Sequence, residues 1–387
     1  MKSVYKTLFF LPLLTAMIGS YTSCSHDDLP NNGNPRIRYI RVTDPLSADS
    51  LLVGAAQGNL IAIVGENLGN AREIWFNDQK AVLTRTYITN SSILVSVPSQ
   101  VPLNITNQMR IVFANGSTLE HAFEVQISEP IVSSIDNEYA ITGDVATIRG
   151  NYFYEPLTVT FTGGAVAELV SIEDDLLQVR IPADAQIGPV TIETAFGQTP
   201  SDFWFRDNRN IILSSDPFTG WWNASFVVSD PGAGDPPAIN GNYIRVTASI
   251  SAWTWMEVAG GPADAMGDIS KNIPDEAILK PEDYYLKFEV NTVKPYNNNM
   301  IKFNFGLQSE VNDAYQWAPP FDTGGQWRTV TIPYETIMRS YTDLDVKPVV
   351  NPNGYWTRVL IHGPGDWDCD IAFDNFRIVP KIDKSKK

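Results

Sequence analysis

The chain has 387 residues, enough for two or three domains of ordinary size. Its 28 Lys and Arg residues stand against 44 Asp and Glu residues, which gives a formal net charge of −16. A surface this acidic repels phosphate backbones, so the composition argues against nucleic acid as a partner, whereas a neutral polysaccharide would not be repelled.

The N-terminus has the pattern of a secretion signal. Lys2 and Lys6 provide positive charge ahead of the apolar run 8–18, which is too short to cross a bilayer comfortably. Small residues directly before Cys24 resemble the cleavage site of a bacterial lipoprotein. We therefore predict that residues 1–23 form a signal peptide and that Cys24 is lipidated; the alternative is plain secretion with an unmodified cysteine.

The segment after Cys24 is predicted to be a flexible tether over residues 24–35, because it is rich in Pro, Gly and Asn. Its acidic pair, Asp27-Asp28, resembles the export signal that places lipoproteins on the outside of the outer membrane in some gut-type Gram-negative bacteria. This implies an outer-membrane protein that faces the cell exterior and contacts the membrane through its lipid alone. Cys369 then has no partner for a disulfide or a cysteine-based zinc site, and we expect it to be buried.

Residues 36–206 read as short strands separated by turn residues, a spacing that predicts antiparallel sandwiches. Two blocks recur at offsets of 85 and 84 residues, which indicates a tandem duplication. The segments 63–68 and 148–153 form the first pair, and 93–98 and 177–182 form the second. The shared element has an apolar residue, Gly two positions later, and Asn-Leu or Tyr-Phe starting two positions after the Gly. This element resembles the IPT/TIG family of immunoglobulin-like (Ig-like) domains. The resemblance implies one domain over residues 36–127 and a second over 128–206.

The C-terminal region, residues 207–380, contains eight of the ten tryptophans. Its strand-like runs and scarce helical pattern predict a larger jelly-roll sandwich, followed by a short tail at 381–387. The expected strands are Tyr243–Ile250, Trp253–Val258, Tyr284–Val293, Met300–Leu307, Arg328–Ile332, Trp356–Ile361 and Ile371–Val379. On a regular strand, Trp253, Trp255 and Glu257 would share one face. Two indoles there would make either a core layer or a flat surface for the apolar face of a sugar ring.

The run Phe373-Asp374-Asn375-Phe376-Arg377-Ile378 resembles the terminal strand of carbohydrate-binding modules. The whole layout resembles a family of surface glycan-binding proteins that accompany outer-membrane glycan importers of the starch-utilisation type. This resemblance implies an all-β chain, with two tandem Ig-like (IPT/TIG) sandwiches followed by a carbohydrate-module-like jelly roll. It also implies aromatic glycan contacts at Trp221-Trp222 and at Trp253 and Trp255.

Not every tryptophan is expected to bind. Trp317 lies in a loop-like stretch, so we expect it to be exposed and include it with Glu257 among the glycan-binding candidates. Trp327 starts an alternating strand and is expected in the core, while the pattern leaves Trp356 and Trp367 open. The single tryptophans of the repeats are interpreted as packing residues. Further polar candidates beside the rings are Asn223, Asn242, Arg245 and Gln316.

No motif marks a catalytic site. The three histidines are scattered, and the sequence has neither a nucleophile elbow nor a P-loop. His362 is interpreted as a loop or surface residue. We expect no cofactor; alternating Asp366, Asp368 and Asp370 could hold a structural Ca²⁺, but a solvated face is favoured over this reading.

Together these features predict a non-catalytic cell-surface protein that binds polysaccharide on an aromatic platform and delivers it to a neighbouring outer-membrane importer complex. The expected ligands are neutral β-glycans, namely xyloglucan, mixed-linkage glucan, β-1,3-glucan or β-mannan. The alternatives are a surface glycoside hydrolase with Ig-like spacers and a structural adhesin whose tryptophans are all core.

Overall fold

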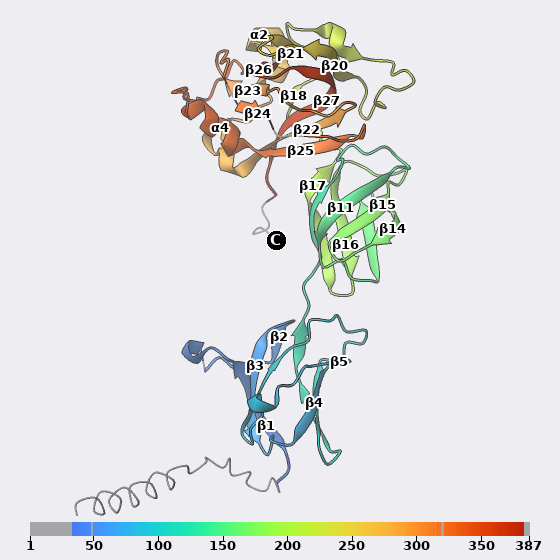
Figure 1. Cartoon of the computed structure of the whole chain (residues 1–387), viewed down its shortest axis with the longest axis vertical. Coiled ribbons are helices and arrows are strands. Elements are labelled where there is room, and N and C mark those ends of the chain that lie inside the picture. The colour runs from blue at the N-terminus through green and yellow to red at the C-terminus, as the bar shows by residue number, and fades with distance from the viewer. Residues whose placement is uncertain (1–32, 48, 314, 319–320, 383–387) are drawn as a thin grey trace, which may run out of the picture. The chain divides into compact units, whose positions relative to one another are not determined.

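The computed structural model describes residues 33–47, 49–313, 315–318 and 321–382 (Figure 1). The predicted signal peptide, Cys24 and most of the tether lie outside these residues. The chain divides into two compact units after Ile127. Strands dominate both units, so the predicted all-β class is confirmed. Among the described residues, no helix combines the length and apolar character needed to cross a membrane.

The first unit is a sandwich built from three small sheets. They have the strand orders β1-β3-β6, β5-β4-β7-β8 and β2-β9, the last pair being parallel. The core lies between the sheets and includes Ile63, Ile93 and Phe76. The strands are β1 (Arg36–Val42), β2 (Gly54–Ala56), β3 (Leu60–Glu66), β4 (Ala71–Phe76), β5 (Gln79–Lys80), β6 (Ser92–Ser96), β7 (Gln108–Phe113), β8 (Thr118–Ala122) and β9 (Glu124–Gln126), with 3-10 turns η1 (Pro45–Ser47) and η2 (Arg85–Tyr87).

The second Ig-like sandwich begins the second unit. Its two four-stranded sheets have the orders β10-β11-β15-β14 and β13-β12-β16-β17, and they enclose a separate core. The strands are β10 (Ile131–Ile135), β11 (Val145–Asn151), β12 (Leu157–Phe161), β13 (Ala165–Val166), β14 (Glu168–Ile172), β15 (Leu176–Arg180), β16 (Gly188–Thr194) and β17 (Gly197–Phe205).

The repeated sequence element has the same structural role in both sandwiches. Gly65 and Gly150 lie where the first strand of each domain shifts register against its neighbour, and a Cβ at either glycine would overlap a carbonyl oxygen of that strand. Two positions later the chain adopts positive φ, 59° at Asn67 and 62° at Tyr152. The next residue, Leu68 or Phe153, is then buried in the core. The motif therefore specifies a close approach of two strand backbones at the glycine, followed by a large apolar side chain in the core.

The C-terminal domain is a sandwich of two unequal sheets. One has the order β19-β20-β27-β22-β25, with β18 also paired to β27, and the other has the order β21-β26-β23-β24. A single aromatic-rich core lies between them. The strands are β18 (Ile211–Leu213), β19 (Val227–Val228), β20 (Tyr243–Ile250), β21 (Met256–Gly261), β22 (Tyr284–Thr292), β23 (Ile301–Leu307), β24 (Tyr315–Trp317), β25 (Arg328–Pro333), β26 (Trp356–Ile361) and β27 (Trp367–Pro380). The helices are α2 (Ala263–Met266), α3 (Asp275–Leu279) and α4 (Tyr334–Thr342), with 3-10 turns η3 (Ala224–Phe226), η4 (Gly267–Lys271) and η5 (Pro281–Asp283).

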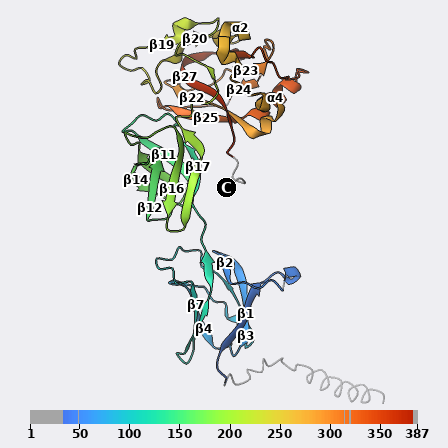
Figure 2. The same ribbon diagram turned by 180° about the vertical axis from the view of Figure 1, so that it is seen from behind.

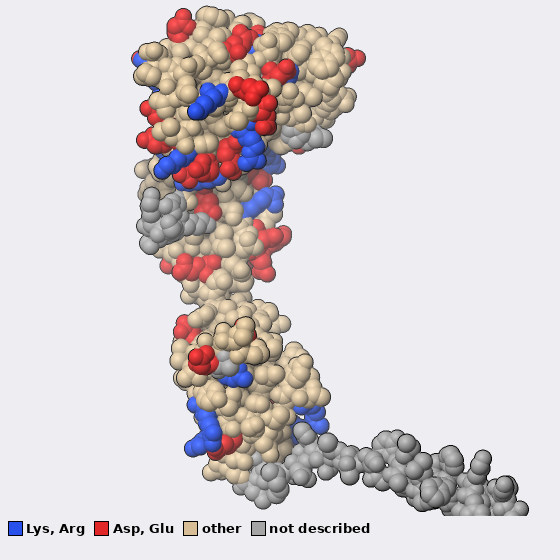
Figure 3. All heavy atoms as spheres, turned by 90° about the vertical axis from the view of Figure 1, so that its left-hand side faces the viewer, with Lys and Arg blue, Asp and Glu red and all other residues tan. Residues whose placement is uncertain are grey.

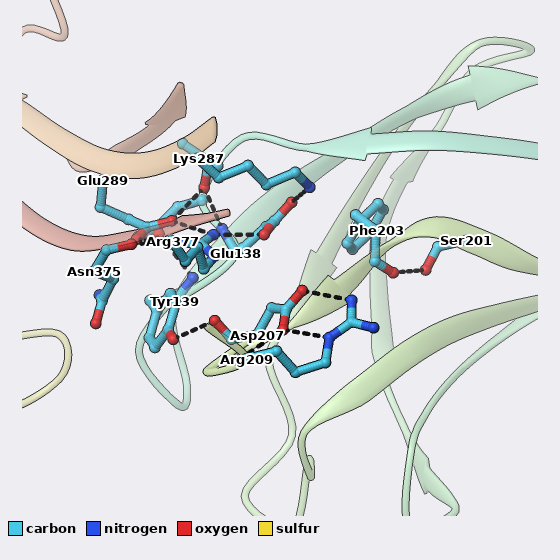
Figure 4. A network of polar contacts seen from close by, with 12 residues as sticks. Glu138, Tyr139, Ser201, Phe203, Asp207, Arg209, Lys287, Glu289, Asn375 and Arg377 are labelled. Atoms are coloured by element: carbon cyan, nitrogen blue, oxygen red, sulfur yellow. Dashed lines mark hydrogen bonds and ion pairs between the residues drawn. The ribbon is translucent and has the colours of Figure 1, made fainter. Parts of the chain in front are cut away.

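The second Ig-like domain and the C-terminal domain lie side by side within the second unit (Figures 1 and 2). A buried ionic network of side chains joins them. Glu138, in the loop after β10, accepts hydrogen bonds from Lys287 (2.5 Å) and from Arg377 (2.6 Å), while Arg377 also donates to Glu289 (2.8 Å), as Figure 4 shows. All four side chains are 5% exposed or less. Two carboxylates balance two cations, so the network can be buried without a net charge. Backbone contacts reinforce it, because Thr329 of β25 donates to the carbonyl of Asp136 (2.8 Å).

Candidate binding site

An interrupted row of aromatic rings lies on the outer side of the sheet β21-β26-β23-β24. We call Trp221, Trp222, Trp253, Trp255 and Trp356 the aromatic row. Trp221 is 60% exposed, Trp253 61% and Trp255 45%. Side chains this large and apolar are seldom left so open to water, and a cluster of them marks a candidate binding surface.

Trp253 and Trp255 do not lie on a strand, so the predicted strand Trp253–Val258 is wrong in its first half. β20 ends at Ile250 and β21 starts at Met256, and the residues between form a loop. Trp253 has φ of 60°, in the left-handed region and outside the range of regular strands, and its N–H donates to the carbonyl of Gly363 (2.6 Å). The two rings nevertheless share a neighbour, since both contact the imidazole of His362 at centroid distances of 5.4 and 4.8 Å.

Trp221 and Trp222 are held against the sheet by a close backbone contact. Gly220 bridges Gly260 of β21, and a Cβ at Gly220 would overlap the Gly260 carbonyl, which accepts the Trp221 N–H (2.8 Å). The Trp222 ring lies 34° from the plane of Trp356, whereas Trp221 stands edge-on to both. Of this adjacent pair, Trp221 is the exposed residue and Trp222 is half-buried.

Arg358 joins the two parts of the row. Its guanidinium carbon lies 5.4 Å from the Trp222 ring centroid and 5.1 Å from that of Trp255. The side chain is 2% exposed and is neutralised by Glu257 and by Glu310, the latter at 2.7 Å. Glu257 also accepts the indole N–H of Trp255 (2.8 Å). The guanidinium plane and the ring of Trp255 are thus fixed by one carboxylate.

A second polar cluster lies beneath Trp253 and Trp255. Lys302 of β23 donates to Nδ1 of His362 (3.1 Å) and forms an ion pair with Asp313 (2.8 Å). Burial and the neighbouring Lys302 charge lower the pKa of His362, so the imidazole is neutral at pH 7. The hydrogen bond from Lys302 lowers the pKa of Asp313. Each charge therefore has an opposite partner, and the histidine is left uncharged.

Several other candidates are placed elsewhere by the structure. Trp317 was expected to be exposed, but it is 5% exposed and stacks on Tyr296 in the core, because its segment forms β24. It therefore offers no surface to a ligand. Trp327 is buried, as predicted. Trp367, which the sequence pattern left open, is buried too. Cys369 is also buried, as predicted.

The polar candidates largely have structural partners. Arg245 pairs with Asp370 on the neighbouring strand β27, Asn242 donates to the carbonyl of Ser215, and Asn223 donates to the Glu257 carbonyl. Gln316 is exposed on β24. The three alternating aspartates do not converge on a cation, because Asp368 pairs with Lys294, Asp370 with Arg245, and Asp366 accepts the Ala252 N–H. Within the described residues no group of His, Cys, Asp or Glu has the arrangement of a metal site.

Sequence reasoning missed Arg358, Lys302 and the contact role of His362. A signal for Arg358 was present, since residues i and i+2 of a strand share a face and Trp356 precedes it by two. For Lys302 and His362 the sequence offered no such signal, because their contact joins residues 60 positions apart.

An all-β chain whose last sandwich carries exposed indoles beside buried polar groups has the architecture of a carbohydrate-binding protein. Comparisons with known proteins agree. Residues 205–380 match the family model described as the surface glycan-binding protein B xyloglucan binding domain.

Three relatives each cover 90% or more of this chain. A Bacteroides ovatus protein named as an IPT/TIG domain-containing protein is 24% identical over 498 residues of alignment, which span 98% of this chain and 100% of that protein. The crystal structure of surface glycan-binding protein PbSGBP-B from Prevotella bryantii is 25% identical with a TM-score of 0.69, and the match covers 90% of this chain and 99% of that chain. SGBP-B from a complex xyloglucan utilization locus in Bacteroides uniformis matches at 19% identity and a TM-score of 0.48, over 90% and 100% of the two chains. The predicted resemblance to surface glycan-binding proteins is confirmed.

Proposed function

We propose that this chain is a non-catalytic, lipid-anchored protein of the outer cell surface that captures a neutral β-glycan on the aromatic row. The observation that carries the proposal is the exposure of Trp221, Trp253 and Trp255 on the domain that matches a glycan-binding family. A pyranose with equatorial hydroxyls has an apolar face, and its burial on an indole is worth about 1 to 2 kcal/mol at roughly 25 cal/mol per Å².

The charge of the site supports a neutral ligand. Arg358 and Lys302, the two cations beneath the row, are both paired with carboxylates. On the face shown in Figure 3, basic side chains occur singly or in small groups among acidic ones. Such a surface offers no strong attraction to a polyanion. Among neutral glycans, xyloglucan is the first candidate because of the family that residues 205–380 match; mixed-linkage glucan, β-1,3-glucan and β-mannan are the others.

The ion pairs of Arg358 also support binding without hydrolysis. A glycosidase needs a carboxylic acid that can give up a proton beside the scissile bond. Glu257 and Glu310, beside the row, both form ion pairs with the buried Arg358 guanidinium, so each is already engaged as the partner of a cation. We therefore place the chain as a capture protein that hands its glycan to an outer-membrane importer complex rather than as the enzyme that cleaves it.

Affinity gel electrophoresis of residues 25–387 against the four candidate polysaccharides tests binding. We expect retardation by at least one of them. Trp255→Ala and Trp222→Ala should each weaken binding about 5- to 30-fold, the equivalent of about 1 to 2 kcal/mol. Trp75→Ala, which removes a half-buried tryptophan of the first unit, is the matched control and should leave retardation unchanged. No retardation by any polysaccharide would contradict the proposal, and loss of the polysaccharide in the gel would indicate an enzyme.

The anchor is tested separately in cells. The full chain should take up radiolabelled fatty acid and become accessible to protease added outside intact cells. Cys24→Ala should remove the label. A labelled Cys24→Ala protein would show that this residue is not the anchor.

A further inference from the structure

We propose that His362 is a specificity-determining residue of the glycan site, where its Nε2–H donates a hydrogen bond to an oxygen of a sugar stacked on Trp253 or Trp255. The inference rests on the proposed function and deepens it. Its basis is a juxtaposition: a single imidazole contacts both exposed indoles, at 5.4 Å from Trp253 and 4.8 Å from Trp255.

The imidazole is held in one tautomer. The Lys302 ammonium has only donors, so Nδ1 of His362 must accept its hydrogen bond (3.1 Å), and the proton of the neutral ring is then on Nε2. Lys302 is itself fixed, because its side chain is 4% exposed and it pairs with Asp313. The chain Asp313–Lys302–His362 thus orients a neutral donor.

The Nε2 side of the ring is open. His362 is partly exposed, and in the described part of the chain the one hydrogen bond of its ring is made by Nδ1. Its Nε2 is also not among the buried nitrogens and oxygens that lack a partner, so this atom faces solvent. A sugar ring stacked on the exposed surface of Trp253 or Trp255 would bring its hydroxyl groups close to the neighbouring imidazole. An uncharged donor there suits the oxygen of a neutral glycan, whereas a free ammonium would favour a carboxylate.

Two substitutions at His362 distinguish the contribution of its N–H donor to affinity from that of its aromatic ring. His362→Phe keeps an aromatic ring between the indoles but has no N–H, so we expect affinity for a xyloglucan oligosaccharide, measured by isothermal titration calorimetry, to fall about 3- to 10-fold. His362→Gln places an amide N–H near the original Nε2 and should recover part of that loss. Lys302→Met keeps the buried stem but frees the tautomer, and it should lower affinity less than His362→Phe.

A spectroscopic readout distinguishes hydrogen bonding from packing. In ¹⁵N-labelled protein, His362 should show a protonated Nε2 and an unprotonated Nδ1, and addition of the oligosaccharide should shift Nε2 while leaving Nδ1 in place. His121, in the first unit, is the internal control and should not respond. If His362→Phe binds as tightly as the parent and Nε2 does not shift, the inference fails although the proposed function stands. Absence of binding by the parent to any of the four polysaccharides would instead remove the proposed function.

Discussion

Removal of Glu138 should destabilise the C-terminal domain more than any surface substitution, although Glu138 belongs to the preceding domain. Glu138→Ala leaves Lys287 without its carboxylate in a place where the lysine is 5% exposed, and leaves Arg377 with Glu289 alone. Loss of one partner from a buried ionic network costs about 3 to 5 kcal/mol, because a desolvated charge remains uncompensated. We therefore expect the free energy of unfolding to fall by about that amount.

Tryptophan fluorescence during urea unfolding measures the effect. Eight of the ten tryptophans lie in residues 207–380, so the signal reports mainly on the C-terminal domain. At about 3 kcal/mol per M of urea, the midpoint should fall by about 1 to 2 M. Glu168→Ala is the matched control, since it breaks an ion pair with Arg180 whose side chains are 66% and 45% exposed, and it should cost less than about 1 kcal/mol.

A double variant tests the cause. Glu138→Gln combined with Lys287→Met removes one charge of each sign and leaves Arg377 paired with Glu289, so it should be more stable than Glu138→Ala. If Glu138→Ala unfolds at the midpoint of Glu168→Ala, the network does not contribute as argued.

Three further substitutions address other parts of the fold. Trp317→Ala should lower the free energy of unfolding by about 3 to 5 kcal/mol, as judged by urea unfolding, because it empties a core site; a midpoint equal to that of the parent would place the ring outside the core. Gly150→Ala should lower the melting temperature in calorimetry, since its Cβ would overlap the Ile131 carbonyl; Gly164→Ala meets no atom within 4 Å and carries only the strain of its positive φ, so a larger decrease at Gly150 would be due to the overlap. Asp235→Asn should lower the melting temperature at pH 7 and should lower it by less at pH 3. The Gly232 N–H and then Arg245 lower the pKa of Asp235 below its ordinary 3.8, so its contribution is present above that value and disappears as pH falls through the lowered pKa. An equal difference at both pH values would contradict this assignment.

Regular elements could be predicted from the sequence where local pattern and tertiary environment agree. The strands Tyr243–Ile250 and Trp356–Ile361 have the predicted bounds. The loop before Met256 was wrongly predicted to be a strand. The left-handed backbone at Trp253 goes with a hydrogen bond to Gly363, and the alternation of residue types in the sequence does not reveal it. Helix α4 was overlooked although its buried residues have helical spacing: Tyr334, Ile337, Met338 and Tyr341.

The candidate site was only partly accessible to the same reasoning. Tryptophans are visible in any sequence, but their exposure depends on whether a neighbouring segment becomes a strand. Trp317 entered the core because its segment pairs with β23. The polar partners depend on pairing across the sheet, as when Arg358 of β26 meets Glu257, 101 residues earlier. A single sequence, without an alignment of homologues, does not reveal which distant residues are in contact.

The network around Arg377 also determines where this protein can be cut. The strand β27 that bears Arg377 is central to the C-terminal sheet, yet the carboxylate that completes its neutralisation is 239 residues earlier. A fragment that begins at residue 205, where the family match starts, would keep the whole aromatic row. It would however lack the second Ig-like domain, so Lys287 and Arg377, which are buried in the longer chain, would become exposed. The transplantable module therefore begins at Ser128, and a glycan-binding reagent made from this chain should include the second Ig-like domain as part of its fold.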